Sequence, residues 1–93
     1  MLRRFDTSGD PVADRRYHWA DGLLADGDAT AAAMLLAETA MMVPDWPAVW
    51  ARLGDAYAAD GALAAAADAY RKALEADPAD LLGVGLKLAR LRL

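Results

Sequence analysis

Few side chains in this sequence are suited to chemistry, and the single histidine is the first of them. His18 lies four residues after Asp14 and three before Asp21, a spacing that brings all three onto one face of a helix. A structural zinc site usually needs three or four convergent ligands, and one imidazole beside two exposed carboxylates is a poor set. We therefore interpret this face as solvated and predict no metal site.

The other arrangements that could support catalysis fail on residue type or on context. The chain has one histidine and no cysteine, so neither a Ser–His–Asp nor a Cys–His arrangement is credible. Gly83, Val84 and Gly85 resemble a nucleotide loop, but such a loop needs a strand before it and a helix after it. Here the glycines lie in an apolar stretch after a proline. We interpret them as part of a helix packed tightly on its neighbour, and we expect no cofactor.

Length and charge exclude several classes of protein. The chain has 93 residues, enough for one small domain, and a formal net charge of −4. Basic residues cluster near the two ends (Arg3, Arg4, Arg15, Arg16, and Lys87, Arg90, Arg92), while the span between them is acidic. An acidic body repels phosphate, so we expect no nucleic-acid partner. No apolar run approaches ~18 residues and the N-terminus lacks a signal peptide's apolar core, so we expect no membrane partner and a cytoplasmic protein.

The chain repeats itself with a period of about 34 residues, a length typical of stacked helix–turn–helix units. At that offset Gly27 coincides with Gly61, and Asp21 coincides with Asp55. No such unit can bury its apolar face alone, so neighbouring units must stack.

Local capping signals divide the repeat into helices. Aspartates or prolines stand where helices would begin, and glycines or prolines where they would end. We predict five helices: Pro11 to about Ala25; Asp28, as cap, to before Pro44; Pro47 to Gly61; about Ala62 to Ala76; and Leu81 to about Leu91, capped by Asp80. Nothing in the chain alternates with the period of a strand.

The second repeat carries a family signature. Within residues 47–80, the motif W-x2-L-G-x2-Y is formed by Trp50, Leu53, Gly54 and Tyr57, and the later signature sites are Ala66, Tyr70, Ala73 and Pro78. This segment closely resembles a tetratricopeptide repeat. Small residues at Gly54 and Ala66 would let the two helices of the unit approach closely.

The resemblance extends to the rest of the chain in weaker form. Residues 13–46 resemble a degenerate first repeat, residues 81–93 a capping helix or the start of a third repeat, and residues 1–12 form an N-terminal lead. The resemblance implies an all-α fold, a right-handed antiparallel helix-turn-helix array of two repeats with a C-terminal capping helix.

A narrower resemblance gives an alternative function. The segments SGDPVADRRYHWADGLLADGD, MVPDWPAVWARLGDA and DPADLLGVGLKLARLRL look like the N-terminal tetratricopeptide region of bacterial predicted S-adenosylmethionine-dependent methyltransferases. It implies an accessory region whose catalytic domain lies beyond Leu93. By itself this chain would not methylate anything, and it would not bind S-adenosylmethionine.

The family resemblance implies a protein-interaction module that binds a peptide or a helix in a concave groove. The first helix of each unit would line this groove, with Tyr17, Asp21, Leu24, Ala51, Asp55, Ala58 and Ala89. Asp21 and Asp55 are equivalent in the repeat, so they either favour a basic or amide-bearing ligand or simply solvate the face. A chaperone's C-terminal carboxylate is not expected, because Asp21 would repel it.

Two further apolar sets raise the question of docking. Met34, Met41 and Met42 could form an adaptable binding surface, but we interpret them as core residues of the second predicted helix. Leu82, Leu86 and Leu93 lie around the last predicted helix from the stripe that packs inward. We expect them to form a docking face, covered by a second copy of the chain or by a downstream domain.

Overall fold

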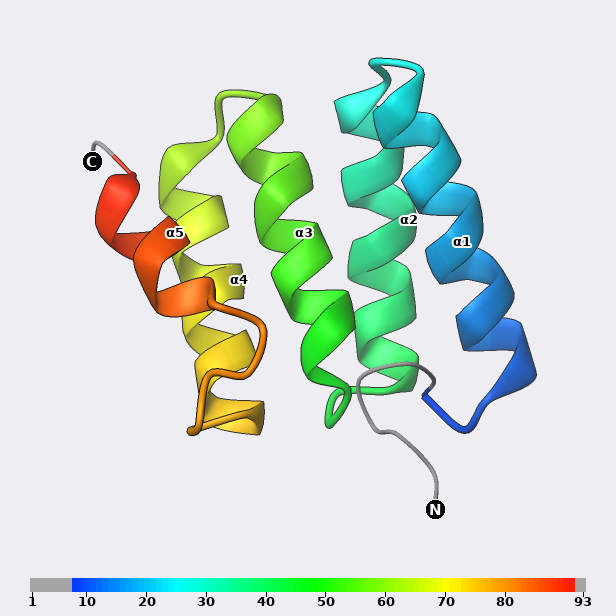
Figure 1. Cartoon of the computed structure of the whole chain (residues 1–93). Coiled ribbons are helices and arrows are strands. Elements are labelled where there is room, and N and C mark those ends of the chain that lie inside the picture. The colour runs from blue at the N-terminus through cyan, green and yellow to red at the C-terminus, as the bar shows by residue number, and fades with distance from the viewer. Residues whose placement is uncertain (1–7, 92–93) are drawn as a thin grey trace.

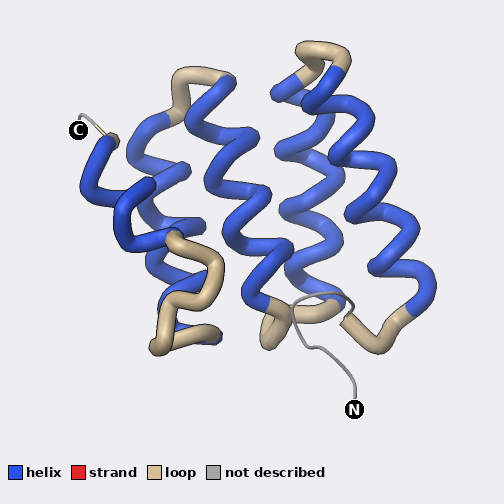
Figure 2. Tube along the Cα trace, in the orientation of Figure 1, coloured by secondary structure: helices blue, strands red, loops and turns tan. Residues whose placement is uncertain are grey.

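Residues 8–91, the part of the chain that a computed structural model describes, fold into five helices and contain no strand (Figures 1 and 2). The helices are α1 Pro11–Ala25, α2 Ala29–Met42, α3 Pro47–Ala59, α4 Leu63–Ala76 and α5 Val84–Arg90. The all-α prediction is confirmed. None of these helices is long and apolar enough to cross a membrane.

Each helix packs against the helix that follows it in the sequence (Figure 1). Successive helices run in opposite directions, with α1 at one end of the row and α5 at the other. The shortest extent of the molecule is 19 Å, close to two helix diameters of about 10–12 Å. The array of helices is therefore about two helices thick.

The predicted caps act where the sequence places them. The Asp10 carboxylate accepts hydrogen bonds from the backbone nitrogens of Val12 and Ala13, at 2.9 and 3.4 Å, and Pro11 opens α1. The Asp28 carboxylate accepts from the nitrogen of Ala31 at 3.2 Å. These bonds satisfy backbone donors that have no partner inside the helix.

The turns after α1 and α3, one repeat apart in the sequence, have the same geometry. Gly27 and Gly61 are both left-handed, with φ of 85° and 81°. After α1, the backbone nitrogens of residues 27 and 28 donate to the carbonyls of residues 24 and 23, and after α3 residues 61 and 62 donate to 58 and 57 in the same pattern. This is the Schellman motif, which satisfies the last carbonyls of a helix.

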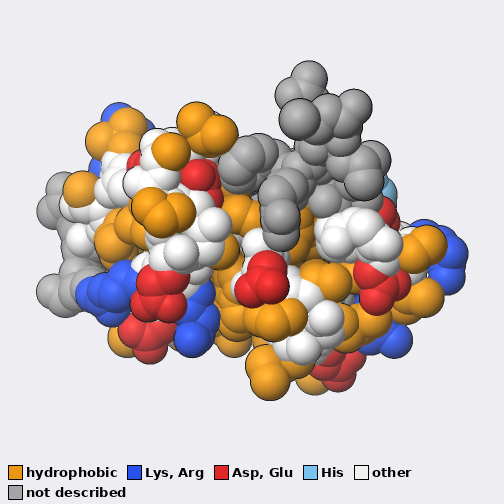
Figure 3. Space-filling model, turned by 90° about the horizontal axis from the view of Figure 1, so that it is seen from below, with side chains coloured by type: hydrophobic (Ala, Val, Ile, Leu, Met, Phe, Trp, Pro, Cys, Tyr) orange, Lys and Arg blue, Asp and Glu red, His pale blue; other side chains and the backbone are white. Residues whose placement is uncertain are grey.

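Small residues bring α3 and α4 together. A Cβ built at Gly54 would overlap the ring of Tyr70, which is 3% exposed. Ala66 is fully buried beside them. Alanine supplies much of the core, while several larger apolar side chains, among them Trp19, Met34 and Leu81, are exposed. Figure 3 shows hydrophobic side chains between separate acidic and basic groups on the face seen from below.

The predicted start of the last helix is wrong by three residues. Residues 81–83 form a turn, and α5 begins at Val84, after Gly83 in a left-handed conformation with φ 70°. Gly83 is therefore not part of a helix. Asp80 still acts as a cap, because its carboxylate accepts from the nitrogens of Val84 and Gly85 at 2.6 and 2.9 Å. It does so from a left-handed position, φ 55°, so its side chain reaches across the turn.

Candidate functional site

An open pocket lies on the face formed by α1, α3 and the segment that contains α5. Its volume is about 120 Å³. It is lined by Tyr17 of α1, by Ala48, Ala51, Arg52 and Asp55 of α3, by Leu82 of the turn before α5, and by Lys87 of α5. The alternate helices of the array thus contribute to one concavity, which we call the groove pocket.

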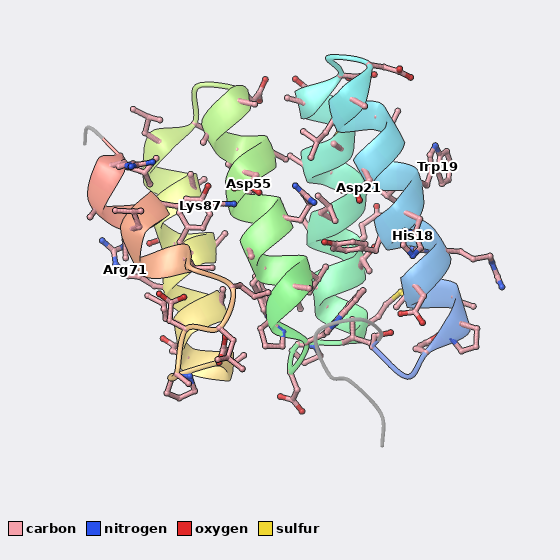
Figure 4. The ribbon with its side chains drawn as sticks, viewed as in Figure 1. His18, Trp19, Asp21, Asp55, Arg71 and Lys87 are labelled. Atoms are coloured by element: carbon pink, nitrogen blue, oxygen red, sulfur yellow. The ribbon has the colours of Figure 1, made fainter. Side chains whose placement is uncertain are left out.

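Three linked ion pairs among four charged side chains lie at the groove pocket. Arg52 Nε lies 2.8 Å from Asp21 Oδ1, and Arg52 Nη1 lies 3.4 Å from Asp55 Oδ2. Lys87 Nζ lies 3.1 Å from both carboxylate oxygens of Asp55, and Figure 4 shows these two side chains pointing toward each other between α3 and α5. The two carboxylates and two cations cancel in formal charge.

Arg52 lies at the centre of this network. Burial disfavours its charged form, but Tyr17 and the two carboxylates outweigh that effect and raise the pKa of Arg52 above its ordinary value. Its Nε is buried and makes no aligned hydrogen bond, so the contact with Asp21 is an ion pair only. Arg52 therefore remains charged and links α3 to α1.

Tyr70 of α4 connects a further helix to this network. Its hydroxyl on α4 donates to Asp55 Oδ1 at 2.6 Å. Burial, the hydrogen bond and the negative charge of Asp55 together raise the pKa of Tyr70 well above its ordinary value. The tyrosine therefore stays neutral, and it holds the carboxylate toward Lys87.

The structure brings part of the predicted groove set together. Tyr17, Ala51 and Asp55 line the groove pocket, and Asp21 reaches it through Arg52. Leu24 and Ala58 are half-buried and pack on the core instead. Ala89 is exposed on α5 but does not line the pocket.

Sequence reasoning missed two cations of this pocket. Arg52 lies three residues before Asp55, a spacing that favours an ion pair on a helix, so it could have been found. The sequence places Lys87 only in a basic cluster near the C-terminus. Because both aspartates are paired within the chain, a basic ligand would have to displace Arg52 or Lys87 to reach them.

Two residues of the predicted docking face, Leu82 and Leu86, lie within the described residues. Leu86 is exposed, at 58%, but Leu82 is half-buried and packs against both hydrophobic clusters. The helical spacing that paired them does not apply, because Leu82 precedes α5. Leu93 lies outside the described residues.

The methionines of α2 are not core residues, so that prediction is wrong. Met34, Met41 and Met42 are 66%, 78% and 40% exposed. The core side of α2 is filled by alanines and by the fully buried Leu36. The repeat register indicated that these positions are exposed, because the residues one repeat after Met34 and Met41 are the acidic Asp68 and Glu75.

The carboxylates around His18 are engaged elsewhere. Asp14 Oδ1 accepts from the backbone nitrogen and the hydroxyl of Ser8, at 2.9 and 2.7 Å, while Asp21 pairs with Arg52. Across residues 8–91, no three His, Cys, Asp or Glu side chains gather where they could hold a metal ion.

Comparison with known proteins gives no match, either to a family model or to a curated protein sequence.

Proposed function

We propose that this chain is a protein-interaction module of the tetratricopeptide type, which binds a peptide or helix in the groove pocket and is not catalytic by itself. The observation that carries the proposal is the composition of the pocket. Among the described residues, its lining comes from α1, α3 and the α5 segment, while α2 and α4 contribute nothing to it. The equal turns one repeat apart and the close contact of Gly54 with Tyr70 also support the resemblance.

The chemistry of the pocket favours binding over reaction. Its ionisable groups are engaged with one another, since Asp55 receives a tyrosine hydroxyl and a lysine and Arg52 faces two carboxylates. The two cations of the lining, Arg52 and Lys87, are balanced in formal charge by Asp55 and by Asp21, which pairs with Arg52 from outside the lining. This network therefore has no net charge to select a strongly basic or acidic ligand. A cavity of ~150 Å³ accommodates a benzene-sized group, so a pocket of about 120 Å³ suits one small apolar side chain of a bound segment.

Selection from a random peptide library tests this proposal. We expect the wild-type protein to enrich a consensus with an apolar anchor residue. Titration of the selected peptide should shift the amide NMR signals of the pocket lining, above all those of Ala51, Arg52 and Asp55. Shifts concentrated on α2 and α4, or no enriched consensus, would contradict a groove function.

A matched pair of charge reversals locates the binding site. Lys87→Glu places a like charge beside Asp55 and should weaken binding of the selected peptide at least about ten-fold. Lys72→Glu is the control, because Lys72 lies over the ring of Trp50 at 5.4 Å, outside the pocket lining. It should leave the affinity unchanged.

A further inference from the structure

The outer sides of α1 and α2 form an exposed surface away from the groove pocket. We call it the outer face and define it by two stripes, one on each helix: Val12, Arg16 and Trp19 on α1, and Met34, Glu38 and Met41 on α2. Within each stripe the spacing is four and then three residues, which keeps the members on one side of a helix. Both stripes run apolar, charged, apolar.

The apolar members of the outer face are large and open to solvent. Trp19, Met34 and Met41 are 65%, 66% and 78% exposed, and Figure 4 shows Trp19 pointing away from the other helices at the edge of the array. Tryptophan, methionine and arginine are enriched at the centres of protein interfaces relative to the rest of the surface.

One ion pair sets the register of the two stripes. Arg16 Nη1 lies 3.8 Å from Glu38 Oε1, so these residues are level with each other on antiparallel helices. Three residues beyond Arg16 comes Trp19, and four residues before Glu38 comes Met34. Because each residue of a helix adds only about 1.5 Å of rise, Trp19 and Met34 are also nearly level. The same reasoning places Val12 beside Met41 at the other end.

In the second repeat, the positions equivalent to the apolar residues of the α1 stripe are buried. The residues one repeat after Val12 and Trp19 are Trp46 and Leu53. These are only 5% and 2% exposed, in a cluster with the buried alanines of α2. The first unit therefore presents to solvent a side that the second unit buries.

We propose that the outer face is the interface of a homodimer, in which the occupant is a second copy of this chain. A two-fold axis that runs between the two copies, parallel to α1 and α2, brings each α1 against the α2 of the other copy. Arg16 then meets Glu38 across the interface, twice. Trp19 meets Met34, and Val12 meets Met41. A closed two-fold contact requires such self-complementarity, and the charges and apolar residues of the outer face supply it.

The proposed dimer is independent of the groove function. Tyr17 and Asp21 share the opposite stripe of α1, four residues apart, and face Arg52 of α3 and the groove pocket. The interface leaves that stripe uncovered, so each copy would keep an accessible groove. Failure of one proposal therefore does not imply failure of the other.

Sedimentation equilibrium between about 10 µM and about 1 mM tests the dimer. We expect the wild-type mass to rise toward twice the 9.9 kDa of one chain. Arg16→Glu should raise the dimer dissociation constant at least about ten-fold, because it sets two acidic residues against each other on both sides of the axis. The double exchange of Arg16→Glu with Glu38→Arg should restore association. Trp19→Asp should leave a monomer.

Two exposed control variants separate a specific interface from the general effect of added negative charge. Arg71→Glu breaks an exposed ion pair with Asp68 on α4 and should leave the dimer intact. Leu86→Asp, on α5, should also leave it intact. Circular dichroism checks that every variant keeps its helices. A wild type that stays monomeric at the highest concentration overturns the proposal. So does a dimer that Leu86→Asp dissociates while Trp19→Asp does not, or one that the double exchange fails to restore.

Discussion

Tyr70 of α4 donates its hydroxyl hydrogen to Asp55 of α3 over 2.6 Å, and the same carboxylate faces Lys87 of α5. One buried tyrosine thus joins three helices through a single acceptor. The ring of Tyr70 also rests on Gly54, so the packing of α3 on α4 and the geometry of the groove pocket depend on the same side chain.

Tyr70→Phe should destabilise the fold by ~1.5–3 kcal/mol, the usual effect of losing a hydrogen bond to a charged group. The ring and its packing remain, so the loss reports the hydroxyl alone. Urea unfolding followed by circular dichroism measures it. Tyr57→Phe serves as the control, because Tyr57 is half-buried and its hydroxyl makes no hydrogen bond within residues 8–91. Equal effects of the two substitutions would contradict a supporting role of the Tyr70 hydroxyl.

The stability of the protein should fall at alkaline pH. Burial, the Asp55 hydrogen bond and its charge raise the pKa of Tyr70 in the folded state above the ordinary value of 10.0. This contribution is fully present below pH ~10, the unfolded pKa, and is lost as the pH rises through the folded pKa, since only the unfolded chain then releases the proton. Unfolding curves at pH 8 to 11 would show it. Tyr70→Phe should flatten the decline above pH ~10.

Gly54→Ala and Gly22→Ala should act in opposite directions. An added Cβ at Gly54 overlaps the Tyr70 ring, while at Gly22 of α1 it meets no atom within 4 Å. Overpacking should cost Gly54→Ala ~1–3 kcal/mol, despite alanine's better helix propensity. Gly22→Ala should gain ~0.5–1 kcal/mol from that propensity. Thermal melts of both variants would measure this, and a stabilised Gly54→Ala would show that α3 and α4 are not in close contact there.

Asp80→Ala should release α5 locally. The substitution removes the acceptor for Val84 and Gly85 and puts alanine in a left-handed conformation, so we expect a loss of ~1–2 kcal/mol. Asp80→Asn should lose less, since asparagine tolerates that conformation. Amide hydrogen exchange should accelerate more in α5 than in α3. Asp68→Ala, an exposed site on α4, should leave the exchange of α5 unchanged.

The beginnings of α1, α2 and α3 could be predicted because their signals are local. Asp10 and Asp28 bond to nitrogens two or three residues away, and Pro47 opens α3 by its own geometry. The start of α5 could not be read in this way. The carboxylate of Asp80 reaches four and five residues along the chain, and the intervening Leu82 packs against both hydrophobic clusters.

Helices α1 to α4 and the equal turns that follow α1 and α3 could be predicted from local signals in the amino-acid sequence. The 34-residue offset at which Asp21 coincides with Asp55 is also visible in the sequence. The neutralisation of these aspartates by Arg52 and Lys87 follows from tertiary packing instead, as does the position of Met34 and Met41 outside the core. Lys87 pairs with Asp55 across a separation of 32 in the sequence, and Arg52 pairs with Asp21 on a different helix. Helix signals act over three or four residues, whereas these contacts depend on the relative placement of whole helices, which the packing of alanine and glycine against large side chains sets.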